Sequence, residues 1–333
     1  MEEALAAYVG VKHAIGCNSG TDALVLALRS CDMDQDRGFV VVPAFTFSAT
    51  AAAVELAGGE IVFCDIREED FGIDASKLDK WKLNGAKAVI GVNMFGIPCD
   101  WLGIEKATIG SEIVLIEDAA QSMGAKYCDK RSGSLADIGC TSFYPAKPLS
   151  GIGDGGMVFT NDPERARTIR SMANHGRVGT KRYSAEVVGG NSRLDTIQAA
   201  VLLERFKYFE SNELPWRNGQ ARSYFNKLGI GPAAAIQGHL DLAWSWYPVL
   251  YDTKKERDEA FQDFGGYAGA RIIYPEPLHL MPAFKHYGHK RGDFPVAESV
   301  CERILAFPIV HHWEVNKCLS TMCHAELAAI SLK

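Results

Sequence analysis

Short runs of apolar, β-branched residues alternate with helical patterns along most of this 333-residue chain. The runs are continuously apolar rather than alternating in polarity, which is typical of strands buried on both faces. Such strands, separated by helices, predict a large mixed, mostly parallel sheet in an α/β fold. The predicted strands are residues 40–43, 60–65, 87–93, 113–118, 140–144 and 157–160.

Three segments beside these strands carry the signals of helix ends. Residues 19–30 begin with capping residues and an acid, 48–58 end on a glycine, and 162–174 place acids before arginines. These arrangements suit the unpaired backbone groups and the dipole of a helix, so we expect helices there. Residues 1–13 read as the end of an amphipathic helix and lack the long apolar segment of a signal peptide.

The pattern changes after about residue 194, where strands and helices follow in a different register. The simplest interpretation is a small C-terminal α/β domain attached to the large one, with the large domain over residues 1–210 and the small domain over 211–333. The elements expected in this part are helix 195–214, strand 244–251, helix 253–264, strand 270–275 and a final helix in the tail 311–333.

Composition excludes several classes of function. The chain is 47% hydrophobic and 23% charged, as ordinary globular proteins are. Its formal net charge of -6 argues against a nucleic-acid-binding protein, whose surface would be basic. No apolar run approaches the roughly 20 residues of a membrane span. The 9 cysteines show neither a CxxC pair nor a metal-ligand spacing, so we expect no metal site and a reducing cytoplasm.

A carboxylate, Asp118, ends the strongly apolar strand 113–118. Open α/β sheets bind their ligands at this end of the strands, and a buried carboxylate there needs a cationic partner. Gln121, three residues on, is spaced to hydrogen-bond the same ligand. The alternative is that Asp118 only caps a helix at a strand end, which is by itself the commoner role.

A lysine, Lys147, follows Ser142 and precedes the glycine-rich run 151–156. A single lysine is usually an exposed loop residue. However, Ser142 and the turn at 19–21 offer hydroxyls and backbone N–H groups at a helix start, which suit a phosphate. Pyridoxal phosphate needs a lysine to hold its aldehyde as a Schiff base and an acid to keep its pyridine nitrogen protonated. Lys147 and Asp118 therefore predict a pyridoxal phosphate site.

Three further features have competing interpretations. Phe47 is expected to stack on the pyridine ring, although an isolated phenylalanine is more often a core residue. Arg193, beside Asn191, suits a phosphate or carboxylate, or is a plain surface residue. Residues 151–156 also match the dinucleotide pattern GxGxxG. Because this run leads into a strand rather than a helix, we interpret the match as chance.

These motifs, in this order, resemble the DegT/DnrJ/EryC1/StrS family of pyridoxal phosphate-dependent sugar aminotransferases, which have the aspartate aminotransferase-like fold (fold type I). The resemblance extends over about residues 3–308. It rests on the ordered segments NSGTDALVLAL, PAFTFSATAAAV, IEDAAQSMGA, SFYPAKPLSGIGDGGMVFTND, GGNSRLDTIQAAVLL, YPEPLHLMPAF and GDFPVAE. The chain begins closer to its first helix than the family usually does, and its tail lacks the family's proline-led ending.

The resemblance implies a role for each cofactor contact. Lys147 would form the Schiff base, Asp118 would pair with the pyridine nitrogen, Gln121 would contact the phenolic oxygen, and Phe47 would stack on the ring. A sister group of dehydratases has histidine at the position of Lys147, so the lysine favours transamination.

The family's phosphate and substrate contacts also have matching residues here. Gly20, Thr21 and Ser142 would hold the phosphate, and Asn191 would reach it from the partner subunit of a homodimer with shared active sites. The residues that would contact the substrate are Arg193 and His279.

The function expected from the resemblance is amino transfer from glutamate to a keto group of a nucleotide-linked sugar, in polysaccharide or lipopolysaccharide biosynthesis. The segments 140–156 and 189–200 look closest to the branch that aminates UDP-linked 3-keto acetamido uronic acids. Two alternatives remain: a pyridoxal phosphate enzyme acting on another substrate such as a keto-cyclitol, and a non-catalytic cofactor-binding regulator.

Overall fold

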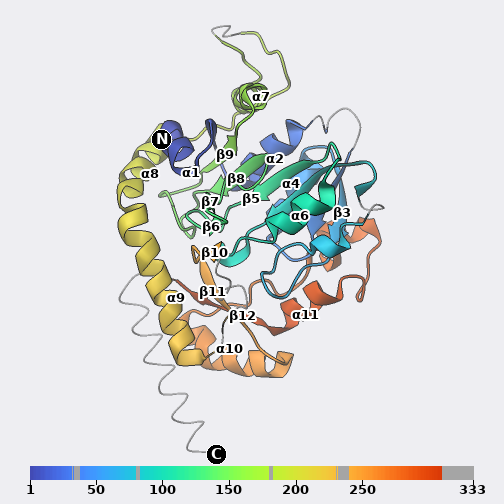
Figure 1. The fold of residues 1–333 in the computed structure, drawn as a ribbon, viewed down its shortest axis with the longest axis vertical. Coiled ribbons are helices and arrows are strands. Elements are labelled where there is room, and N and C mark those ends of the chain that lie inside the picture. The colour runs from blue at the N-terminus through green and yellow to red at the C-terminus, as the bar shows by residue number, and fades with distance from the viewer. Residues whose placement is uncertain are drawn as a thin grey trace, which may run out of the picture.

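A computed structural model of the chain describes residues 1–31, 33, 38–79, 83–179, 183–229, 231 and 240–309. In this part of the chain a seven-stranded sheet forms the centre of the molecule (Figure 1), with strand order β1-β9-β8-β5-β4-β2-β3. Its strands are β1 (His13–Cys17), β2 (Phe39–Pro43), β3 (Glu60–Cys64), β4 (Ala86–Val92), β5 (Val114–Asp118), β8 (Ile138–Ser142) and β9 (Gly156–Thr160).

The direction of the strands confirms the predicted mixed, mostly parallel α/β sheet. Strand β9 pairs antiparallel with both β1 and β8, whereas the other neighbouring strands of this sheet pair in parallel. All six strands predicted for this region are present. Strand β1 was not among the predicted strands, and only its first residue, His13, fell within the segment 1–13 that was assigned to a helix end. That helix, α1 (Glu2–Val9), stops at Gly10, whose left-handed φ of 89° ends it before the strand begins.

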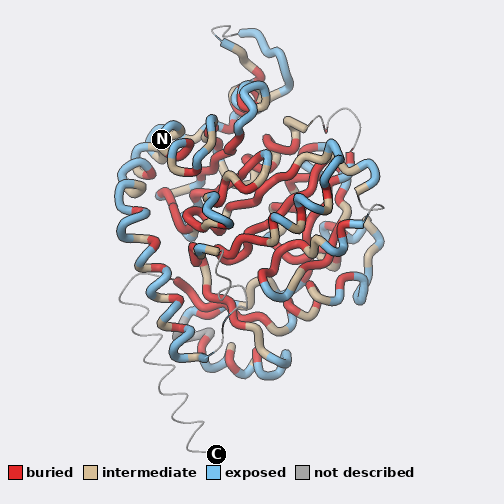
Figure 2. The backbone as a smooth tube through the Cα atoms, in the orientation of Figure 1, coloured by how far each residue is buried: buried red, intermediate tan, exposed pale blue. Residues whose placement is uncertain are grey.

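Helices cover both faces of the sheet, and the three helices predicted beside its strands, over 19–30, 48–58 and 162–174, are confirmed. The helices on one face are α2 (Gly20–Arg29), α4 (Ser48–Leu56) and α7 (Pro163–Ala173), and α6 (Trp101–Thr108) lies on the other. Along β2, Val40 and Val42 pack into the core beneath α2 and α4, while Val41 between them packs with Trp101. Both faces are therefore buried, as the continuous apolar strands predicted, and Figure 2 shows the sheet as the buried layer.

A long helical rod runs along one side of the molecule (Figure 1) and carries the chain to a second, smaller sheet. The rod consists of α8 (Thr196–Tyr208), the π-helical segment η3 (Phe209–Glu213) and α9 (Leu214–Leu228). The small sheet pairs β11 (Trp246–Leu250) antiparallel with β12 (Ile304–Pro308), beside α10 (Lys254–Ala268) and α11 (Pro295–Arg303). The remaining short elements are η1 (Ala75–Lys77), η2 (Met94–Gly96), β6 (Lys126–Tyr127), β7 (Lys130–Arg131), β10 (Leu240–Asp241), η5 (Leu278–Leu280) and η6 (Pro282–Tyr287).

One strand predicted for this second region does not form. The predicted strand 270–275 is wrong, because this segment makes a single bridge, between Arg271 and Ala306. The fully buried β12 takes the position beside β11, so the chain after Arg271 is free to turn toward the large sheet. The expected division at residues 210 and 211 falls inside η3, and the tail helix 311–333 lies outside the described residues. No helix within the described ranges is long and apolar enough to cross a membrane.

Candidate active site

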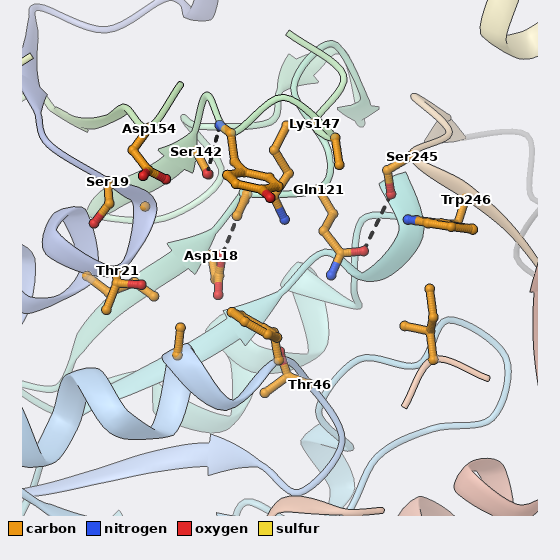
Figure 3. Close-up of a pocket in the computed structure, with 18 of the residues that line it drawn as sticks. Ser19, Thr21, Thr46, Asp118, Gln121, Ser142, Lys147, Asp154, Ser245 and Trp246 are labelled. Carbon is orange, nitrogen blue, oxygen red and sulfur yellow. Dashed lines mark hydrogen bonds between the residues drawn. The ribbon is translucent and has the colours of Figure 1, made fainter. Parts of the chain in front are cut away.

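Side chains from several loops converge at one edge of the large sheet. The carboxyl ends of β1, β2, β5 and β8 lie at this edge because the strands are parallel, and ligands of open α/β sheets bind there. The loops enclose a cavity of about 430 Å³, within the usual range for small-molecule sites (Figure 3). Its polar lining residues include Ser19, Thr21, Thr46, Asp118, Gln121, Ser142, Lys147, Asp154, Ser245 and Tyr274.

Asp118 ends β5 at the floor of this cavity and is buried. Its Oδ1 accepts a hydrogen bond from the Ala120 N–H at 3.1 Å, and its Oδ2 accepts one from the Thr50 hydroxyl at 2.8 Å. Burial raises the pKa of Asp118, while these two donors and the positive charge of Lys147 oppose that rise. The carboxylate is therefore held in place with acceptor capacity left for a cationic ligand.

Lys147 enters the same cavity from the loop that follows β8 (Figure 3). Burial lowers the pKa of its amine, and the negative charge of Asp118 partly offsets that effect. A lowered pKa increases the fraction of neutral amine, which is the nucleophilic form. The structure thus brings together the amine and the carboxylate that the sequence singled out.

The far end of the cavity is a cradle at the start of α2. Ser19 caps this helix by accepting a hydrogen bond from the Asp22 N–H, and the first-turn N–H groups of Gly20 and Thr21 have no acceptors inside the helix. Gly20 lies so close to Ser142 that an added Cβ would come within 2.7 Å of the serine Cβ. The cradle therefore offers hydroxyls, backbone donors and the positive end of a helix dipole, which together suit a phosphate.

A hydrogen bond from a backbone N–H fixes the orientation of the Gln121 side-chain amide. Its Oε1 accepts a hydrogen bond from the Phe95 N–H at 3.0 Å, so its Nε2 must be the other end of the amide. That Nε2 lies 3.5 Å from the Tyr274 hydroxyl, and both residues line the cavity. Its other contact is with Met94 Sδ at 3.7 Å, so the donor end of the Gln121 amide lies beside Tyr274 at the cavity.

Two aromatic rings form one wall of the cavity. Phe47, which immediately precedes α4, is half-exposed, and its ring lies 5.9 Å from that of Tyr274. A planar ligand ring between this wall and Lys147 would find an apolar surface for stacking.

Asn191 and Arg193 do not line this cavity. Both are exposed in the segment between α7 and α8, where Asn191 forms a bridge with Asn174 at the end of α7. Arg193 donates hydrogen bonds to the side-chain oxygens of Asn191 and Asn174, at 3.1 and 3.2 Å. The two residues are therefore held together, and neither is among the residues that line the cavity of their own chain.

His279 is not among the residues that line the cavity. Its ring is fully buried, packs 4.7 Å from the Phe294 ring, and hydrogen-bonds Glu298 through Nε2 at 3.1 Å. Glu298 also accepts from the backbone N–H of Gly292. His279 thus has no exposed surface at the cavity of its own chain, and its predicted contact with the substrate stays a prediction.

Sequence reasoning missed several cavity residues. Ser245 comes from a part of the chain that no motif marked, and Tyr274 opens the segment YPEPLHLMPAF, in which only His279 was given a role. Asp154 belongs to the glycine-rich run 151–156, whose chance match to a dinucleotide motif is confirmed as such, because the run leads into β9 and not into a helix. The hydroxyl that contacts Asp118, on Thr50, lies in a helix whose sequence signals only packing.

Comparison with known proteins identifies relatives of this chain. The profile of the DegT/DnrJ/EryC1/StrS aminotransferase family matches residues 1–320. The UDP-2-acetamido-2-deoxy-3-oxo-D-glucuronate aminotransferase of Pseudomonas aeruginosa is 34% identical, over 98% of this chain and 88% of that protein. A pleiotropic regulatory protein of Geobacillus stearothermophilus is 36% identical, over 93% of this chain and 83% of that protein.

Solved structures agree with the sequence comparison. The crystal structure of a DegT DnrJ EryC1 StrS aminotransferase from Brucella abortus superposes with a TM-score of 0.87 at 37% identity, covering 97% of this chain and 88% of that one. Fold type I is thereby confirmed, and the family profile spans nearly the whole sequence. The chain belongs to the DegT/DnrJ/EryC1/StrS aminotransferase family.

Proposed function

We propose that this protein uses pyridoxal phosphate to move an amino group from glutamate to the keto group of a nucleotide-linked sugar. Aminotransferase activity and pyridoxal phosphate are properties of its family. The single observation that carries the proposal is the pairing of Lys147 with the buried Asp118 in one cavity. We further propose a UDP-linked 3-keto acetamido uronic acid as the acceptor, supported by the Pseudomonas relative that is named for such a substrate.

The residues present fit the cofactor at each of its polar groups. The cradle of Gly20, Thr21 and Ser142 would hold the phosphate, and Asp118 would face the pyridine nitrogen. Gln121, whose Nε2 lies beside the cavity residue Tyr274, would donate to the phenolic oxygen, and Phe47 would lie against the ring. When bound, pyridoxal phosphate supplies an aldehyde that captures amines and a ring that accepts electrons.

Lys147 would act twice through its Nζ. As a neutral amine, favoured by its lowered pKa, it would first hold the cofactor. Once the amino donor has displaced it, the free Nζ would take the proton from the donor's α-carbon and deliver it to the cofactor's C4′, as a general base and then as a general acid. Asp118 would stabilise the positive charge on the ring nitrogen during this transfer.

We also propose a homodimer with shared active sites. In it Asn191 would contact the phosphate bound by the partner subunit, and Arg193 would contact its substrate. This arrangement is supported by the exposure of both residues and by their separation from the cavity of their own chain. Two apolar side chains close to them in the sequence, Val188 on the same segment and Ile197 at the start of α8, are exposed in the single chain and would be covered by a second copy.

We also propose a large domain, residues 1–210, and a small one, residues 211–333, which the rod of α8 and α9 connects. A cytoplasmic location is supported by the cysteines, since the seven in the described residues are all free thiols.

A substrate screen tests the function. The protein, glutamate and a panel of UDP-, dTDP- and GDP-linked keto sugars are incubated with pyridoxal phosphate, and 2-oxoglutarate release is measured. Release that depends on a keto sugar supports the proposal, and the active sugar identifies the acceptor. Cofactor binding without release for any sugar would instead favour the regulator, since the Geobacillus relative is named as a regulatory protein. Release with a keto-cyclitol alone would favour the other alternative.

A further inference from the structure

We propose that Thr50 is a positioning residue that keeps Asp118 ionised by donating a hydrogen bond to it, and that Thr46 supports Thr50 in turn. The inference rests on the proposed function, since it concerns the ring nitrogen that Asp118 would face. Neither threonine was among the residues that the sequence motifs marked for a cofactor role.

Thr50 lies in the first turn of α4, with its side chain toward the end of β5. It is 1% exposed, and its Oγ1 lies 2.8 Å from Asp118 Oδ2. The other carboxylate oxygen, Oδ1, has the Ala120 N–H at 3.1 Å. Asp118 is removed from water here, so these two donors replace its hydration, and Thr50 supplies the shorter bond.

The direction of the hydroxyl contacts follows from counting protons. An ionised carboxylate only accepts, so the single O–H proton of Thr50 is committed to Asp118. Thr46 Oγ1 lies 3.2 Å from Thr50 Oγ1, where either atom has the geometry to donate. Because the Thr50 proton is already used, Thr46 must donate to Thr50. The result is a chain of hydroxyls from the cavity wall to the carboxylate, polarised toward the negative charge.

Loss of the Thr50 hydrogen bond should change which group, Asp118 or the ring nitrogen of the cofactor, carries the proton between them. The titratable groups that act on Asp118 or respond to it are Lys147, Tyr274 and the buried thiol of Cys140. Lys147 is the cation among them, and it already opposes protonation of Asp118. Without the Thr50 hydrogen bond the pKa of Asp118 would rise. The proton on a pyridine nitrogen beside it would then shift from the ring to the carboxylate.

The test compares Thr50→Val, which keeps the branched shape and removes the hydroxyl, with Thr50→Ser, which keeps the hydroxyl. Each variant is loaded with pyridoxal phosphate labelled with ¹⁵N in the ring, and the ¹⁵N chemical shift is measured across pH. In Thr50→Val the shift should move toward that of an unprotonated pyridine, and turnover should fall roughly tenfold to hundredfold. Thr50→Ser should restore both values to near those of the unaltered protein.

Two further variants keep the test decisive. Thr46→Val should produce a smaller change of the ¹⁵N shift in the same direction, and it serves if Thr50→Val does not fold. Thr160→Val is the matched control, because Thr160 is also buried and bonds a backbone carbonyl instead of the site. An unchanged ¹⁵N shift in a folded, cofactor-loaded Thr50→Val, or in Thr46→Val where the former is unfolded, would overturn the inference. Failure of the unaltered protein to bind the cofactor would overturn the proposed function instead.

Discussion

Replacement of Asp118 by asparagine separates the two interpretations of this residue. The amide has nearly the shape of the carboxylate, and its oxygen still accepts a hydrogen bond from Thr50 or from the Ala120 N–H. What is lost is the negative charge at the floor of the cavity. If Asp118 only capped a strand end, turnover would survive; if it stabilises a protonated ring nitrogen, turnover would fall.

The size of the loss follows from the burial of the carboxylate. Two opposite unit charges about 4 Å apart interact by about 4 kcal/mol at an effective dielectric constant of about 20. The amide dipole recovers part of this, which leaves on the order of 3 kcal/mol of the barrier. That corresponds to a fall in kcat of roughly 100-fold or more.

The assay is 2-oxoglutarate release at saturating glutamate and keto sugar, with cofactor occupancy measured on the same samples. Asp65 supplies the control, because it too is buried just after a strand, and it caps α11 by accepting from the N–H groups of Val296 and Ala297 at 3.1 and 2.9 Å. Asp65→Asn should lower the free energy of unfolding by about 1 kcal/mol and leave kcat nearly unchanged. A near-normal kcat in loaded Asp118→Asn would refute the reasoning.

Three more outcomes are expected. The purified, loaded protein should be yellow, and reduction with borohydride followed by peptide mapping should find the cofactor on Lys147; attachment to another lysine would contradict its assigned role. Cofactor capture by the apoprotein should accelerate as pH rises, because burial lowers the Lys147 pKa and only the neutral amine attacks an aldehyde. In Asp118→Asn that rise should move to lower pH, since the charge that raises the Lys147 pKa is gone, and stopped-flow absorbance would reveal a rise that fails to move. Finally, Lys147→Ala and Asn191→Asp should each abolish most activity as homodimers, whereas mixed dimers of the two should recover roughly a quarter of it, given two-fold symmetry and random assortment. Demonstrated mixed dimers without activity would remove Asn191 from the partner's site.

The sequence by itself determined the large sheet and the core of the site. Continuous apolar strands have to be buried on both faces, so a parallel sheet covered by helices was the consistent outcome. Parallel strands end at one edge, which is why Asp118 after β5 and Lys147 after β8 meet in one cavity although 29 positions separate them. The capping serine before α2 likewise marked the cradle at the start of that helix from local pattern alone.

Tertiary structure decided what depends on contacts between distant segments. The bond from Thr50 to Asp118 spans 68 positions, and Tyr274 reaches the cavity because β12, rather than segment 270–275, occupies the place beside β11. The burial of His279 against Phe294 likewise depends on a contact between two separate segments. Local sequence cannot specify such pairs, because many apolar and hydroxyl side chains satisfy the same pattern, and only the packing of the whole chain selects which of them meet.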